Sequence, residues 1–175
     1  MRTVYVADTG VFVRCGGPDN EKFQRLRRTL QQADVSLHVP RRVYEELGGD
    51  PAAEEYPSGD IPYPVGFEEG WIVVADGLDY ADPLVSTVMD GARRFIANET
   101  GRTEDAVEKA DAALIGVAAQ LLDTGQADSV VLLTTDKPAG RAGEIILSEH
   151  GFGGRFEYRY VSVDYLETIT ATSFR

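Results

Sequence analysis

The chain has 175 residues, of which 43% are hydrophobic, and its 29 acidic residues against 17 lysines and arginines give a formal net charge of -12. This length suits one buried core and is too short for two ordinary domains, so we expect a single domain over residues 1–175. Cys15 is the only cysteine, which excludes an intramolecular disulfide and favours a reducing, cytoplasmic setting.

Five short apolar or β-branched runs predict strands, which are, in chain order, 3–8, 34–40, 71–76, 129–135 and 158–163. Apolar residues at helical spacing predict helices at 21–33, 41–49, 83–100, 103–125, 142–151 and 164–169. Thr103 is the expected cap of the longest helix, Gly125 its terminator, and the Pro- and Gly-rich segment 48–70 an expected loop insertion. Strands alternate with helices, and several strands are apolar on both faces. The pattern predicts a doubly wound, three-layer α/β/α fold around a mostly parallel sheet of about five strands.

The longest mostly apolar stretch, AALIGVAAQLL, is shorter than a membrane span, so we expect no membrane partner. The acidic charge has two interpretations, because it repels phosphate backbones at low salt but is screened over ~3 Å at 1 M salt. Either nucleic acid is not a partner, or the protein works in a halophilic cytoplasm. The scarcity of lysine, with only Lys22, Lys109 and Lys137, favours the second interpretation.

Two aspartates follow predicted strands. Asp8 comes after the first strand, in VADTG, and Asp136 after the fourth, in LLTTD. In a parallel sheet both belong to the carboxyl edge, where ligands bind, and the first strand is usually central. Either residue could instead cap the turn or helix that follows it. We therefore expect the two carboxylates to face one crevice, with capping as the alternative.

Two further acids come from predicted helices. Glu46 lies at the border of the apolar face of its helix, and Asp111 shares a stripe with apolar residues that should pack inward. Glu46 could instead be solvated beside Glu45, and Asp111 could pair with Lys109 or an arginine. Four converging carboxylates would repel one another, and hard oxygen ligands suit Mg²⁺ or Mn²⁺. Neither histidine has a spacing typical of a zinc site.

In order along the chain, the motifs VADTG, VPRRVYEEL, EKADAALIGVA and LLTTD resemble those of the PIN domain, the nuclease fold of VapC-type toxins and RNA-processing endonucleases. The resemblance implies that Asp8, Glu46, Asp111 and Asp136 are catalytic and bind Mg²⁺ or Mn²⁺, and that Thr134 or Thr135 supplies a hydroxyl that helps to position them. Glu108, one helical turn before Asp111, is a candidate outer ligand.

The resemblance further implies a metal-dependent endoribonuclease with an RNA substrate, and it leaves open a homodimer, an antitoxin-like protein partner, and a role in toxicity or in RNA maturation. Arg14, Arg41, Arg42 and Lys137 are the candidate phosphate contacts, together with the two threonines. Two alternatives remain: a catalytically inactive PIN-like module that binds RNA or protein, and a small-molecule phosphohydrolase that uses Asp8 as its nucleophile.

Overall fold

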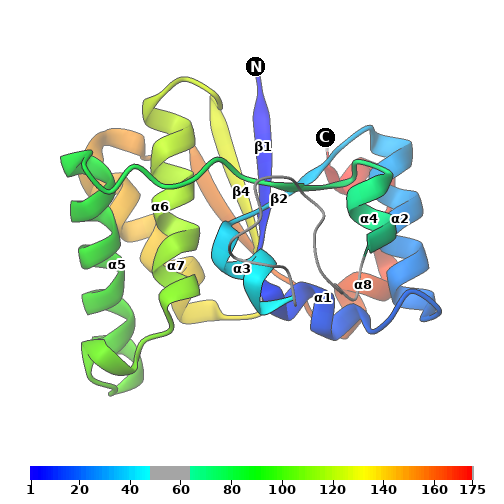
Figure 1. Cartoon of the computed structure of the whole chain (residues 1–175), viewed down its shortest axis with the longest axis horizontal. Helices are drawn as coiled ribbons and strands as arrows, with labels where there is room; N and C mark the ends of the chain where they lie inside the picture. The colour runs from blue at the N-terminus through cyan, green and yellow to red at the C-terminus, as the bar shows by residue number, and fades with distance from the viewer. Residues whose placement is uncertain (48–63, 175) are drawn as a thin grey trace.

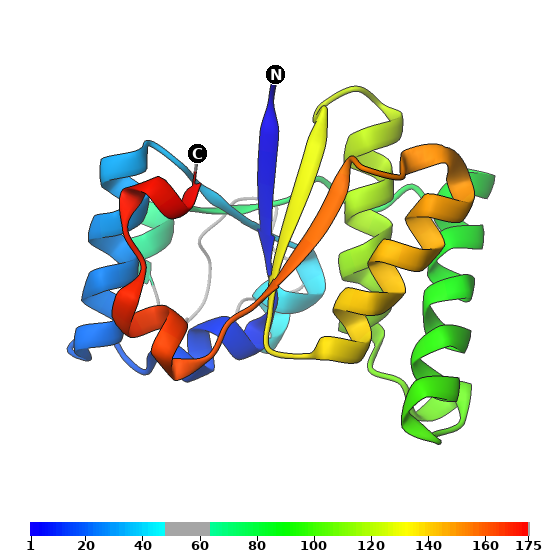
Figure 2. The ribbon, with the colours of Figure 1, turned by 180° about the vertical axis from the view of Figure 1, so that it is seen from behind.

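The computed structural model describes residues 1–47 and 64–174 (Figures 1 and 2). The strands are β1 Thr3–Ala7, β2 Leu37–Val39, β3 Ile72–Val74, β4 Ser129–Thr134 and β5 Phe156–Tyr160. The α-helices are α1 Thr9–Cys15, α2 Glu21–Ala33, α3 Arg41–Glu46, α4 Pro64–Glu68, α5 Pro83–Thr100, α6 Lys109–Asp123, α7 Lys137–Leu147 and α8 Val163–Thr168. Two 3₁₀-helices, η1 Glu104–Ala106 and η3 Ala171–Phe174, and a π-helical segment, η2 Ser148–Phe152, complete the elements.

The five strands form one parallel sheet in the order β3-β2-β1-β4-β5. The chain therefore winds outward from β1 through β2 to β3, and then returns past β1 to build β4 and β5 on the other side. This reversal places β1 at the centre and a crevice between the carboxyl ends of β1 and β4. The expected doubly wound fold with a parallel five-stranded sheet is confirmed.

Helices cover both faces of the sheet, which makes three layers (Figures 1 and 2). On one side α6 packs on β1 and β4, α7 packs on β4 and β5, and α5 lies against α6 and α7. On the other side α1, α2 and α8 pack against one another. Because both faces are covered, β4 is buried without alternation from Val130 to Thr134, as its uninterrupted apolar sequence predicts.

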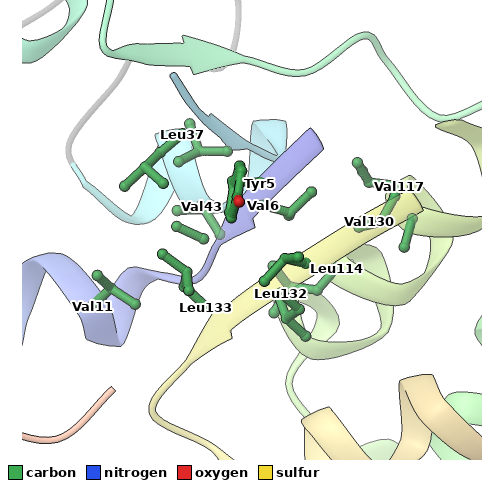
Figure 3. Packing of buried hydrophobic residues seen from close by; sticks show 14 of the residues in the cluster. Tyr5, Val6, Val11, Leu37, Val43, Leu114, Val117, Val130, Leu132 and Leu133 are labelled. Carbon is green, nitrogen blue, oxygen red and sulfur yellow. The ribbon is translucent and has the colours of Figure 1, made fainter. Parts of the chain in front are cut away.

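The core is continuous across the central strands. Figure 3 shows Leu132 of β4 beside Leu114 of α6. Both leucines are at most 1% exposed, so α6 is held on its face of the sheet by close apolar packing. This rigid centre carries the loops at the carboxyl edge.

Two helices lie where the sequence predicts none. Helix α1 follows β1 directly: Asp8 caps it by accepting from the Val11 amide at 3.1 Å, and Val11 and Phe12 are fully buried. Its glycine and valines are poor helix formers, so burial of one apolar face outweighs local propensity here. Helix α4 occupies part of the predicted loop 48–70, and residues 48–63 of that prediction lie outside the described residues.

The predicted helix 103–125 is interrupted. Its first residues form η1, Val107 is extended with φ -75° and ψ 129°, and α6 begins only at Lys109. Val107 is 5% exposed, so its side chain enters the core, and this burial accompanies the break in the helix. The cap of α6 is therefore Glu108 and not Thr103, and Asp111 lies in the first helical turn.

Several boundaries also differ from the predicted ones. Helix α7 begins five residues before the predicted start at 142, because Asp136 caps it and Pro138 fits its first turn. Strand β5 covers Phe156–Tyr160 in place of 158–163, since Ser162 caps α8 and ends the extended segment. Strands β2 and β3 are shorter than predicted.

In the described part of the chain, no helix is long and apolar enough to cross a membrane.

Candidate active site

A pocket of about 420 Å³ opens at the carboxyl edge of the sheet, beside the ends of β1 and β4. All four acids expected at the site line it. The lining residues are Asp8, Thr9, Gly10, Glu46, Arg102, Glu108, Ala110, Asp111, Leu114, Thr135 and Asp136. The fold thus brings residues from the start of α1, α3, α6 and the β4–α7 connection to one place.

Asp8 is a buried lining residue of this pocket and accepts three hydrogen bonds. Its Oδ1 accepts from the Val11 amide at 3.1 Å, and its Oδ2 accepts from the Thr135 amide at 3.1 Å and from the Thr134 hydroxyl. Burial raises the pKa of Asp8, with a smaller contribution from the charge of Asp136, while the three hydrogen bonds oppose the rise. Capping and a place in the pocket, the two interpretations of Asp8, therefore hold together.

Asp136 is fixed in a similar way. Its Oδ1 caps α7 by accepting from the Ala139 amide at 3.2 Å, and its own amide donates to Thr134 Oγ1 at 3.0 Å. The Thr134 hydroxyl thus accepts from Asp136 and donates to Asp8. Thr134 is fully buried and does not line the pocket, so it positions the two acids and does not reach a substrate. Thr135 does line the pocket.

Asp111 has the most perturbed environment. Burial raises its pKa to about 7, and the charges of Asp136, Asp8 and Glu108 add to the rise, whereas Arg102 lowers it. No salt bridge to Asp111 forms among residues 1–47 and 64–174, so the alternative of a direct pair with Lys109 is not realised there. An inward carboxylate without a paired cation is costly, which favours a proton or a metal ion at this position.

The two adjacent glutamates of α3 point to different places. Glu46 accepts from the Thr9 hydroxyl and lines the pocket, although it is exposed. Glu45 lies 3.5 Å from Arg42 and lines the neighbouring pockets. Of the two, Glu46 is therefore the residue that can join the other acids.

The pocket fits a hard divalent cation by its chemistry. Among its described lining residues are five carboxylates, those of Asp8, Glu46, Glu108, Asp111 and Asp136, and one cation, Arg102. In the described residues, however, no three His, Cys, Asp or Glu side chains are close enough to hold an ion without moving. Oxygen donors of this number and charge suit Mg²⁺ or Mn²⁺, and the side chains would have to move to surround the ion.

None of the four expected basic contacts lines the acidic pocket. Arg41 and Arg42 begin α3 and line an adjacent pocket, and Arg14 and Lys137 gather around Tyr160 on β5. Arg102, which sequence reasoning missed, does line it. Its one sequence signal is a basic residue shortly before the helix that carries Asp111, and this signal is weak because arginines next to helices are common.

Comparison with known proteins identifies the family. A model of the halobacterial PIN domain matches residues 1–174, and a search of curated proteins finds no match. PIN domains are generally nucleases, and PIN nucleases generally use divalent metals. The halobacterial family also agrees with the acidic composition. Matched over almost its whole length and built on a parallel five-stranded sheet, the chain belongs to the halobacterial PIN domain family.

Proposed function

We propose that the chain is an endoribonuclease that hydrolyses phosphodiester bonds of single-stranded or looped RNA and depends on Mg²⁺ or Mn²⁺. The observation that carries the proposal is the pocket at the carboxyl ends of β1 and β4, which five carboxylates and Arg102 line and in which the pKa of Asp111 is raised to about 7. Strongly perturbed acids in a cleft are typical of functional sites. Membership of a generally nucleolytic family supports the same reaction class.

In this proposal Asp8, Glu46, Asp111 and Asp136 hold the metal, with Glu108 as an outer ligand. A divalent ion, when bound, lowers the pKa of a water molecule, polarises the phosphoryl oxygen and offsets developing charge.

Three groups of this chain have complementary tasks. Thr134 fixes the positions of Asp8 and Asp136 relative to each other through its two hydrogen bonds. Asp111, with a pKa of about 7 in the metal-free pocket, holds a proton near neutral pH that it would release to solvent on binding the ion. Arg102, which lines the pocket, can offset negative charge on phosphoryl oxygens of a bound substrate.

The remaining contacts are proposed to bind the substrate. Arg41 and Arg42 lie on the α3 side of the pocket, and Lys137 and Arg14 on the β5 side, so an RNA strand crossing the pocket would meet cations in both directions. Thr135 lines the pocket and can donate to a phosphate oxygen. Self-association and an antitoxin-like partner also remain proposals, and light scattering on the purified chain tests the first.

The test is cleavage of labelled RNA, both single-stranded and hairpin, in Mn²⁺ and in EDTA. We expect Mn²⁺-dependent cleavage by the wild type. Asp8→Asn and Glu46→Gln should abolish it, and the rate of cleavage should fall at least ~100-fold in Asp8→Asn. Glu45→Gln is the matched control, because Glu45 neighbours Glu46 but does not line the acidic pocket. A contaminating ribonuclease would cleave the RNA equally in the preparations of the wild type, the control and the site variants.

Melting temperatures and a chromogenic phosphate ester separate the alternatives. A rise in melting temperature with Mn²⁺ but no cleavage of any RNA would indicate a binding module without turnover. Hydrolysis of the ester alone would indicate a small-molecule phosphohydrolase. Cleavage that survives EDTA and Asp8→Asn would overturn the proposal.

A further inference from the structure

A cluster of two cations and one aromatic ring lies at the end of β5, outside the acidic pocket. The Lys137 Nζ lies 4.7 Å from the centre of the Tyr160 ring, and the Arg14 guanidinium carbon lies 5.6 Å from it. Arg14 Nη1 also donates to the Val161 carbonyl at 2.7 Å and to the Tyr160 hydroxyl at 3.3 Å. Tyr160 is 38% exposed, so part of its surface faces solvent.

The sheet register places this cluster next to the acids. Tyr160 is the β5 partner of Thr134 on β4, the residue that positions Asp8 and Asp136. The Val161 amide continues the ladder by donating to the Thr134 carbonyl at 2.8 Å. Lys137 directly follows Asp136 in the chain. Adjacent parallel strands lie ~4.8 Å apart, so the ring lies one strand from the candidate catalytic residues along the same edge.

The cluster carries positive charge in a chain whose net charge is -12. Neither Arg14 nor Lys137 is within salt-bridge distance of an acid in residues 1–47 and 64–174, so both cations are available to an anionic ligand. A positively charged aromatic surface beside an acidic pocket favours a ligand that has both negative charge and a flat ring face.

We propose that Tyr160, Arg14 and Lys137 form a nucleotide-binding subsite of the nuclease, in which a base of single-stranded RNA stacks on Tyr160 and the adjoining phosphates contact Arg14 and Lys137. The subsite rests on the proposed function and names the residues that hold the strand beside the cleavage site. Lys137 is exposed, so its ammonium can leave the ring for a phosphate when a base takes its place. Arg14 is held by the Val161 carbonyl and keeps its position.

An aromatic platform has a physical advantage in a salt-rich cytoplasm. Contacts between cations and phosphates weaken steeply as salt rises, because the strand no longer gains by releasing its counterions. Stacking of a base on a ring depends little on ionic strength and is retained. The subsite would therefore supply binding that an acidic surface at high salt cannot obtain from charge alone.

Binding is measured by fluorescence anisotropy with a labelled single-stranded RNA in Ca²⁺, and kcat and KM are measured separately in Mn²⁺. Tyr160→Ala should weaken binding and raise KM by roughly 5- to 150-fold, at both ~0.2 M and ~2 M KCl. Tyr160→Phe, which keeps the ring, should stay within about 2-fold of the wild type. An RNA with abasic sites should bind wild type and Tyr160→Ala equally, because only the base can stack.

Arginine variants supply a matched control for charge and fold. Arg155 also lies 5.6 Å from a ring, that of Phe152, and also donates to a backbone carbonyl, but it lies at the opposite, amino edge of the sheet. Arg14→Ala should weaken RNA binding more at low salt than at high salt, whereas Arg155→Ala should leave it unchanged. Melting curves check the fold of each variant, and Tyr160→Leu replaces Tyr160→Ala if the latter melts early.

The outcomes distinguish the subsite from the nuclease activity. Cleavage by the wild type with an unchanged KM in both Tyr160→Ala and Tyr160→Leu overturns the subsite and leaves the nuclease intact. Binding that is lost in these variants, in a protein that cleaves no RNA, supports the subsite and overturns the nuclease. If the wild type neither binds nor cleaves the RNA, both are overturned.

Discussion

Asp111 shows how one residue can link stability to the site. Its carboxylate lies in the first turn of α6 among Asp8, Asp136 and Glu108, and burial with these charges raises its pKa to about 7 from the ordinary 3.8. In the unfolded chain the group ionises near its ordinary value, while in the folded, metal-free protein it stays protonated up to neutral pH. Folding is therefore favoured while the group is protonated, and this contribution is lost as pH rises from about 4 to about 7.

The first prediction at this scale compares Asp111→Asn with the wild type in EDTA. The variant should be more stable at pH 8 by on the order of 2 kcal/mol, since a shift of one pKa unit corresponds to about 1.4 kcal/mol and partial exposure reduces the full effect. The difference in free energy of unfolding should shrink as pH falls to about 4. Urea denaturation across this pH range measures it, and a difference that does not change with pH would contradict the assignment.

The second prediction concerns the Thr134 hydroxyl, which links the two aspartates. Thr134→Val has nearly the same shape but leaves the Asp136 amide without its partner and removes a donor from Asp8. We expect a loss of ~1–3 kcal/mol in the free energy of unfolding and a large fall in kcat. Thr134→Ser should retain both properties. Equal loss in the serine variant would indicate that the methyl group, and not the hydroxyl, matters.

At the scale of elements, helix α7 depends on close contact with β5. A Cβ at Gly140 would lie 2.3 Å from Cδ2 and 2.4 Å from Cγ of the Tyr158 ring, well inside van der Waals contact. The root of a ring attached to a strand cannot move aside cheaply. Because Asp136 caps α7, any shift of the helix also moves a candidate metal ligand.

Gly140→Ala should therefore lower the free energy of unfolding by roughly 1–3 kcal/mol and reduce Mn²⁺-dependent cleavage. Gly17→Ala is the matched control, because nothing lies within 4 Å of a Cβ built there. Thermal melting of both variants measures the effect. A Gly140→Ala protein as stable as the control would show that α7 and β5 tolerate separation.

The predicted elements differ most from the structure where local signals conflict with packing. Helices α2 and α5 have the predicted bounds, because their periodic apolar residues and caps agree with their burial. Helix α1 was missed, because its valines and glycine are poor helix formers and its burial depends on distant elements. The break before α6 was also missed, because burial of Val107 is a tertiary contact.

At the scale of the whole molecule, charge dominates. The net charge of -12 acts against compaction at low salt, and the five carboxylates of the pocket add local repulsion. Screening reduces both effects, so the metal-free protein should be stabilised by salt well above physiological concentration.

We expect the melting temperature in EDTA to rise between ~0.1 M and ~2 M KCl, mainly because repulsion among acids is screened. Sucrose is the control, since it is excluded from the protein surface but screens no charge. If Asp111→Asn and Asp8→Asn reduce the increase in melting temperature that KCl causes, part of the repulsion lies in the pocket. A melting temperature that does not increase with KCl, or that increases equally with sucrose, would contradict the prediction.

The sequence by itself determined the fold class and the two strand ends that carry Asp8 and Asp136, because run lengths, apolar periodicity and the position of a residue after a strand are local properties. The resemblance already named Glu46 as the second acid, whereas only the tertiary structure decided that Arg102 joins the acids and that Tyr160 lies beside Lys137. The position of Tyr160 depends on its pairing with Thr134, a contact between residues far apart in the chain. Such contacts arise from how the layers pack, which no single segment encodes.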